Sequence, residues 1–167
     1  MLPHYSAKLP QLKYWTVQAF HQCSDSISLT NSNIKSDELT IKIKKMDAEE
    51  LLLRYAAGER DFIGAKLHRA KLVGVKLVGV NLWGADLSGA NLARAKLWGA
   101  NLSGANLAKA NLTRANLSGA LLNEANLRGT KLNSTKLFGA SLNGAYYDDS
   151  TRFARGLDPQ SRNMRHV

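Results

Sequence analysis

The side chains able to carry acid–base or nucleophilic chemistry are few and scattered. The histidines are His4, His21, His68 and His166. The single cysteine, Cys23, has no His or acidic grouping with metal-ligand spacing around it, and His68 has no neighbouring nucleophile in the sequence. We interpret the paired carboxylates Asp148 and Asp149 as acceptors for backbone donors in a turn. The sequence therefore predicts a protein that is not an enzyme and that holds no metal or cofactor.

Recognition chemistry is better represented, because basic residues are concentrated in the middle of the chain. The formal net charge is +10 at pH 7. Residues 62–145 contain eleven Lys or Arg against two acids, whereas residues 46–61 contain two basic residues against five acids. A basic surface attracts nucleic acid, anionic lipid or acidic protein. The simpler interpretation, which we favour, is that the cations keep a rod soluble and block lateral association.

A five-residue repeat must position these residues. A leucine occupies every fifth position from Leu67 to Leu142, with Phe62 in phase before the run and Tyr147 after it. Each leucine follows a small residue by two positions and, except at Leu122, a polar residue by one, and the second residue after it is very often Gly. The predicted structural core consists of Leu67, Leu72, Leu77, Leu82, Leu87, Leu92, Leu97, Leu102, Leu107, Leu112, Leu117, Leu122, Leu127, Leu132, Leu137 and Leu142.

A strict period of five matches neither an α-helix nor a flat strand, so the chain must turn in the same way after each unit. Fixed-period repetition predicts a solenoid, in which each unit buries its apolar face against its neighbours. The leucines and the small residues would point inward, and the other three positions would point outward. Glycine suits the corner because it adopts backbone conformations that a side chain disfavours.

Runs such as Ala85-Asp86-Leu87-Ser88-Gly89 and Ala100-Asn101-Leu102-Ser103-Gly104 resemble the pentapeptide repeat family, cyanobacterial members included. The resemblance covers about half of the chain, in about seventeen consecutive units. It implies an all-β solenoid, specifically a right-handed quadrilateral β-helix with about one pentapeptide on each side. The twenty-residue spacing of Gly79, Gly99, Gly119 and Gly139 agrees with four sides.

Four units per turn would arrange the outward residues in rows, which we predict as a partner surface. The aromatic and apolar members are Val78, Trp98 and Phe138 on one face, and Trp83 with Ile63 and Leu121 on another. The basic members are Lys76, Lys96 and Lys136 on one face, and Arg94 and Arg114 on the adjoining one. Rows of exposed aromatics often mark a contact surface. The alternative is that they cover a folded-back segment or are single tolerated apolar residues.

The chain divides into four predicted segments. Residues 1–45 form a poorly ordered N-terminal extension, either a true tail or an over-extended reading frame before Met46. Residues 46–61 form a capping helix and lead-in, in which Asp47 is the N-cap, Glu50 completes a capping box and Gly58 ends the helix. Residues 62–147 form the repeat β-helix, and residues 148–167 form a C-terminal cap and tail with a frayed end.

We predict a non-enzymatic structural scaffold that displays a rigid β-helical surface to an unidentified protein partner. No long apolar run is present, so we expect a cytoplasmic protein without membrane insertion. Two alternatives stay open. Some pentapeptide repeat proteins resemble duplex DNA and bind DNA gyrase, but that mimicry requires an acidic surface and this one is basic. The basic faces would also suit nonspecific binding of nucleic acid.

Overall fold

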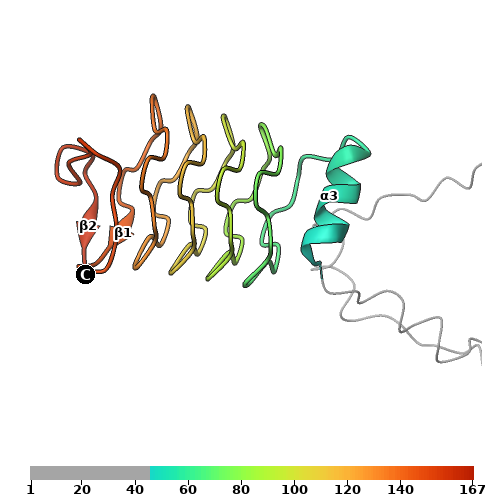
Figure 1. The fold of residues 1–167 in the computed structure, drawn as a ribbon, viewed down its shortest axis with the longest axis horizontal. Coiled ribbons are helices and arrows are strands. Elements are labelled where there is room, and N and C mark those ends of the chain that lie inside the picture. The colour runs from blue at the N-terminus through green and yellow to red at the C-terminus, as the bar shows by residue number, and fades with distance from the viewer. Residues whose placement is uncertain (1–45) are drawn as a thin grey trace, which may run out of the picture. The chain divides into compact units, whose positions relative to one another are not determined.

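The computed structural model describes residues 46–167, and the predictions made for residues 1–45 lie outside this range. A helix, α3 (Ala48–Ala56), opens the described part. A repetitive coil follows, and it leads to two short strands, β1 (Tyr146–Tyr147) and β2 (Arg165–His166). Figure 1 shows α3 at one end of the stacked coils and the two strands at the other.

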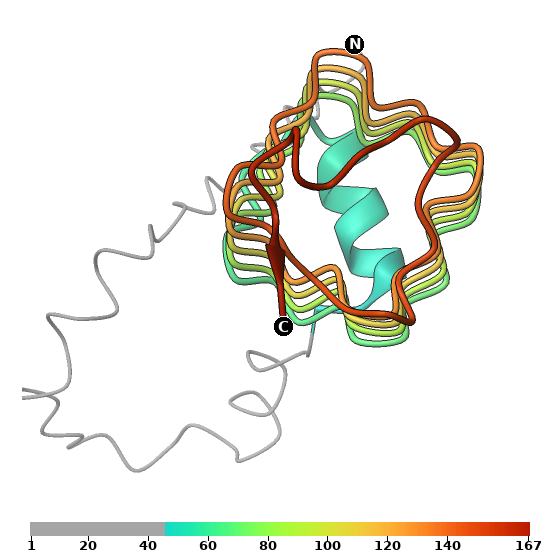
Figure 2. The same cartoon turned by 90° about the vertical axis from the view of Figure 1, so that its left-hand side faces the viewer.

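The coil closes one turn every twenty residues. Isolated parallel bridges join each polar residue before a leucine to the residue twenty positions further on, from Asp61↔Asn81 to Asn126↔Tyr146. Four five-residue units therefore make one turn, and successive turns lie behind one another in Figure 2. Each unit contributes only one bridge and then turns, so longer strands do not form in the coil although its backbone is paired as in a parallel sheet.

The inside of the coil is a continuous apolar column. All sixteen repeat leucines are buried, and so are most of the small residues two positions before them. Thr130, Thr135 and Thr151 take the small-residue position near the C-terminal end and are also buried. The Thr130 and Thr135 hydroxyls donate to main-chain carbonyl oxygens one turn earlier, over 2.7 Å from Thr130 to Leu107 and 2.8 Å from Thr135 to Leu112. The hydroxyl groups therefore enter the core without an unsatisfied donor.

Asparagines before the leucines connect the turns on the outside. The Asn101 side-chain amide donates to Asn81 Oδ1 over 3.1 Å, and Asn126 donates to Asn106 in the same way over 3.1 Å. The same side chains also accept from the backbone two residues on, as Asn101 Oδ1 does from the Ser103 N–H over 3.1 Å. Asparagine therefore fixes both the corner and the stacking of turns, which explains its frequency at this position.

The helix α3 lies against the first turn. Asp47 accepts from the Glu50 N–H over 2.9 Å as the N-cap, Leu51 is fully buried, and the Tyr55 hydroxyl donates to the Val78 carbonyl over 2.9 Å. In contrast, Leu53 is 65% exposed. One stripe of the helix thus covers the apolar end of the column, while the other faces solvent.

The C-terminal segment continues the stack beyond the last regular unit. One extra residue follows β1, so Lys131 pairs with Arg152, twenty-one positions on. β2 then pairs in parallel with β1, in the register Tyr146↔Arg165 and Tyr147↔His166. The prediction that residues 160–167 are frayed is therefore wrong. Residues Arg165–His166 pair with the unpaired edge of β1 through backbone groups. This pairing requires no repeat, so the sequence does not reveal it.

Asp148 closes the irregular corner by accepting several hydrogen bonds. Its Oδ1 receives the Gly129 N–H over 2.9 Å, the Ser150 hydroxyl over 2.7 Å and the Thr151 hydroxyl over 3.1 Å. The Ser150 hydroxyl, followed by the other donors, lowers the pKa of Asp148 from 3.8 to about 2. Gly129 has a φ of 66°, and a Cβ there would lie 3.1 Å from the Ser150 hydroxyl oxygen, so glycine suits the facing corner better than a residue with a side chain.

This arrangement predicts a pH-dependent corner. Because the folded-state pKa is lowered, Asp148 stabilises the corner above its ordinary pKa of 3.8 and loses that effect as the pH falls through about 2. Amide hydrogen exchange at Gly129 should accelerate over this interval in the native protein, and at all pH values in Asp148→Ala. Asp149→Ala is the matched control, because Asp149 accepts only from the His166 ring. Unchanged Gly129 exchange in Asp148→Ala would contradict the assignment.

Candidate interaction surface

Three rows of outward residues lie together along one side of the coil, which we call the lysine face. Its centre is the lysine ladder, in which bridges connect Lys76, Lys96, Asn116 and Lys136 in successive turns. The arginine corner precedes the ladder and contains Gly74, Arg94, Arg114 and Ser134, linked through backbone bonds such as Arg94 N–H to Thr113 O. The aromatic corner follows the ladder and contains Val78, Trp98, Ser118 and Phe138.

The aromatic side chains of this face project into solvent. Trp98 is 52% exposed and Phe138 is 89% exposed, whereas Val78 is half-buried beneath α3. Trp83, which is 54% exposed, lies at a different corner, stacked on Ile63 through the Gly64 N–H to Trp83 O bond. The structure therefore separates Trp83 from the Trp98 row. The backbone register, and not the aromatic residue type, decides which of them share a surface.

The lysine face is electrostatically one-sided. The units at 71–80, 91–100, 111–120 and 131–140 contain seven Lys or Arg and no acidic residue. The alternating units at 61–70, 81–90, 101–110, 121–130 and 141–150 contain four basic residues and five acidic ones. The ion pairs within residues 46–167, Arg54 with Glu59 and His166 with Asp149, both lie outside the lysine face. Within the described part of the chain, its cations therefore have no carboxylate partner.

A hydrogen-bonded His, Ser and Asp chain lies elsewhere on the coil. His68 Nδ1 is 2.7 Å from the Ser88 hydroxyl, which donates to Asp86 Oδ1 over 2.6 Å. The prediction that His68 has no neighbouring nucleophile is therefore wrong, because a residue twenty positions away is its neighbour in the next turn. The Ser88 hydroxyl, aided by its backbone N–H and the positive His68 and Lys66, lowers the pKa of Asp86.

The order of this chain is unsuited to nucleophilic catalysis. A serine nucleophile needs a base to take its proton, with the acid orienting that base from the other side. Here Ser88 lies in the middle, gives its proton to Asp86, and accepts from His68. The three residues therefore hold two neighbouring turns together, and the serine oxygen gains no activation.

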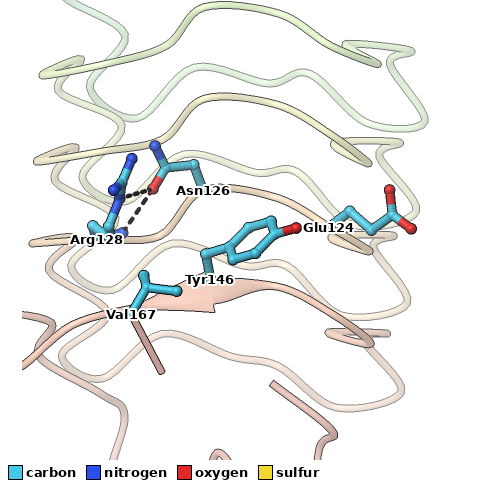
Figure 3. Close-up of a pocket in the computed structure, with 5 residues that line it drawn as sticks. All are labelled: Glu124, Asn126, Arg128, Tyr146 and Val167. Atoms are coloured by element: carbon cyan, nitrogen blue, oxygen red, sulfur yellow. Dashed lines mark hydrogen bonds between the residues drawn. The ribbon is translucent and has the colours of Figure 1, made fainter. Parts of the chain in front are cut away.

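A shallow hollow lies near the C-terminal end. It encloses about 360 Å³ and is lined by Glu124, Asn126, Arg128, Tyr146 and Val167. Figure 3 shows Arg128 turned back onto Asn126, to which its Nε donates over 3.0 Å. The Tyr146 hydroxyl accepts from Arg165 over 3.2 Å. Arg128 and Asn126 are thus engaged with each other, and Tyr146 is engaged with a residue outside the lining.

Among residues 46–167, no three His, Cys, Asp or Glu side chains come close enough to hold a metal ion. No helix in that range has the length and apolar character needed to cross a membrane.

The repeat assigns the chain to a family. The family model described as pentapeptide repeats matches residues 61–84, 85–123 and 110–146, in eight copies. Together with a repeat coil whose sixteen repeat leucines are buried, this match establishes the class. The chain belongs to the pentapeptide repeat family. No curated protein matches the sequence significantly.

Solved structures of similar proteins agree with this assignment. A pentapeptide repeat protein from Nostoc Pcc 7120 is 36% identical, with a TM-score of 0.53, over 72% of this chain and 96% of that one. A pentapeptide repeat protein from the thylakoid lumen of Arabidopsis thaliana is 34% identical, with a TM-score of 0.53, over 60% of this chain and 68% of that one. Both likenesses support a repeat β-helix solenoid.

Proposed function

We propose that this chain is a non-enzymatic interaction scaffold, built as a right-handed, four-sided β-helix capped by α3, that presents its outward rows to a protein partner. The observation that carries the proposal is the fixed stacking of outward rows on a paired backbone, with successive positions one turn apart and with exposed aromatic and basic residues among them. Successive turns of paired backbone are about 4.8 Å apart, so the rows have a regular spacing that a partner can match.

Preorganisation is the physical advantage of such a surface. Binding normally costs the ordering of loops and side chains at the interface. Here the outward rows are anchored by corners whose amides are bonded to the next turn, as at Gly99 N–H to Ser118 O over 2.9 Å. The free-energy cost of ordering the backbone therefore arises during folding and not during binding. The exposed Trp98, Phe138 and Trp83 supply large aromatic side chains, which contribute strongly to interface energies.

The test is capture by the immobilised full-length protein from a source-cell lysate cleared of membranes. We expect a defined protein to stay bound at high salt and to be lost with Trp98→Ser/Phe138→Ser or with Trp83→Ser. The variant that loses it identifies the contact corner. The proposal is wrong if only nucleic acid and acidic proteins bind and salt removes all of them, because nonspecific attraction to the basic surface then accounts for the binding.

Charge disfavours the DNA-mimic alternative. A protein that replaces duplex DNA must present negative charge, and the three rows of the lysine face carry five cations without an acid. Nonspecific binding of nucleic acid remains compatible with this charge, but it gives no role to the projecting Trp98 and Phe138. It also gives no role to Trp83, which is 54% exposed at a separate corner and is of a residue type enriched at protein interfaces, so we favour the scaffold.

A further inference from the structure

We infer that the lysine face docks the coil onto an anionic lipid surface. This role goes beyond the proposed protein scaffold and leaves the Trp83 corner for a protein partner. Three observations concern this face. Its cations have no acidic partners among the described residues, and exposed aromatics lie in an adjoining row. A glycine follows each residue of that aromatic row.

The cations lie next to one another in adjacent turns, and their repulsion destabilises the isolated protein. Lys76 and Lys96 are direct bridge partners in neighbouring turns, and Arg94 stacks on the turn that leads to Arg114. Like charges in adjacent strands destabilise a sheet. Asparagine at these positions would instead add a link to the side-chain ladder, as Asn111 does to Asn91 over 3.3 Å. An external layer of negative charge removes this repulsion and attracts each cation near it.

The aromatic corner suits a membrane interface. Phe138 stands almost free of the coil at 89% exposure, and Trp98 exposes 52% of its surface beside the lysine ladder. An amphipathic ring such as that of Trp98 prefers the headgroup region of a bilayer, and an apolar ring such as that of Phe138 enters the boundary with the acyl chains. In the sequence, each residue of the aromatic corner is followed directly by a glycine, namely Gly79, Gly99, Gly119 and Gly139. A Cβ at Gly79, Gly99 or Gly119 would meet nothing within 4 Å, so the bare backbone there lets a flat surface approach.

Lipid fits these features better than nucleic acid or an acidic protein does. Duplex DNA offers phosphates but no apolar layer for Phe138. Two aromatics two turns apart, about 10 Å, do not form the successive stacking platforms typical of single-strand binding. Protein hot spots usually fill packed pockets, whereas Phe138 projects from a flat face. A fluid anionic surface needs no register with the cations and accepts projecting rings.

The test is co-sedimentation of the full-length protein with phosphatidylcholine vesicles, with and without phosphatidylserine. We expect binding only to the anionic vesicles. Lys76→Gln/Lys96→Gln/Lys136→Gln should weaken it about a hundredfold at low salt, and Trp98→Ser/Phe138→Ser roughly tenfold. The matched control is Trp83→Ser, which removes an equally exposed tryptophan from another corner and should leave binding unchanged. Melting curves of each variant verify that the coil is folded.

Tryptophan emission supplies a second readout. A blue shift on adding anionic vesicles should persist in Trp83→Phe and disappear in Trp98→Phe, in which the conservative ring retains most of the binding. The inference is overturned by equal binding to neutral vesicles, by no vesicle binding, by tighter binding to DNA in the same buffer, or by equal losses in the Trp83 and Trp98 variants. Purified vesicles contain no protein, so this result and the capture result are independent.

Discussion

Replacing Leu122 with alanine should lower the free energy of unfolding by about 3 kcal/mol, within the range of about 2 to 5 that buried leucines show. Leu122 is fully buried in the central column, where leucines of successive turns lie above one another. Removing its side chain leaves a cavity that neighbouring turns cannot fill, because their backbones are bonded in register. Denaturant unfolding followed by circular dichroism measures the change.

The adjacent residue provides the control for this prediction. Leu121 has the same side chain in the same unit but is 44% exposed, and it occupies the outward position where most units have Asn or Lys. Leu121→Ala should change the stability by less than about 0.5 kcal/mol. Equal losses at both positions would show that the inward and outward assignments are wrong.

Replacing Leu51 with aspartate should lower the free energy of unfolding by a similar amount, because Leu51 holds α3 against the first turn of the coil. Leu51 is the fully buried residue of α3, and a carboxylate there would be buried without a partner or would displace the helix. We expect a loss of about 3 kcal/mol. Displacement of α3 would also expose the apolar column and the unpaired edge of the first turn, so the protein should self-associate. Analytical ultracentrifugation measures this association.

The control lies two residues further along the same helix. Leu53 is 65% exposed, so Leu53→Asp introduces the same charge into the same element without reaching the column. This variant should remain stable and retain the oligomeric state of the parent protein. A monomeric, stable Leu51→Asp would mean that α3 does not protect the end of the coil.

Much of the coil is predictable because its signal is local and repeated. The position of Leu102 within its unit is enough to place it inside, and Asn101 in the same unit belongs outside. The number of units per turn is not determined by that period and requires the register of the bridges, for example Asn101↔Leu121. The structure of the C-terminal end is harder to predict from the sequence, because Asp148 and Arg165 stabilise it through contacts that follow no repeat.

The surface features were predictable only after a turn length was assumed. With twenty residues per turn, Lys76 and Lys96 become neighbours, as do His68 and Ser88. The first pair was anticipated from that spacing. The second pair is not apparent from nearness in the sequence, because a solenoid brings residues one full turn apart into contact. The same spacing applied to every polar residue would have found it.

The central claim is that a rigid coil presents preformed rows to a protein partner. Hydroxyl-radical footprinting combined with amide hydrogen exchange, on the full-length protein with and without its captured partner, tests this most directly. We predict that the partner shields Trp83, or Trp98 with Phe138, from hydroxyl radicals. Protected coil amides, such as that of Leu102, should exchange equally slowly with and without the partner. Unshielded aromatics, or coil amides that become protected only when the partner binds, would contradict it.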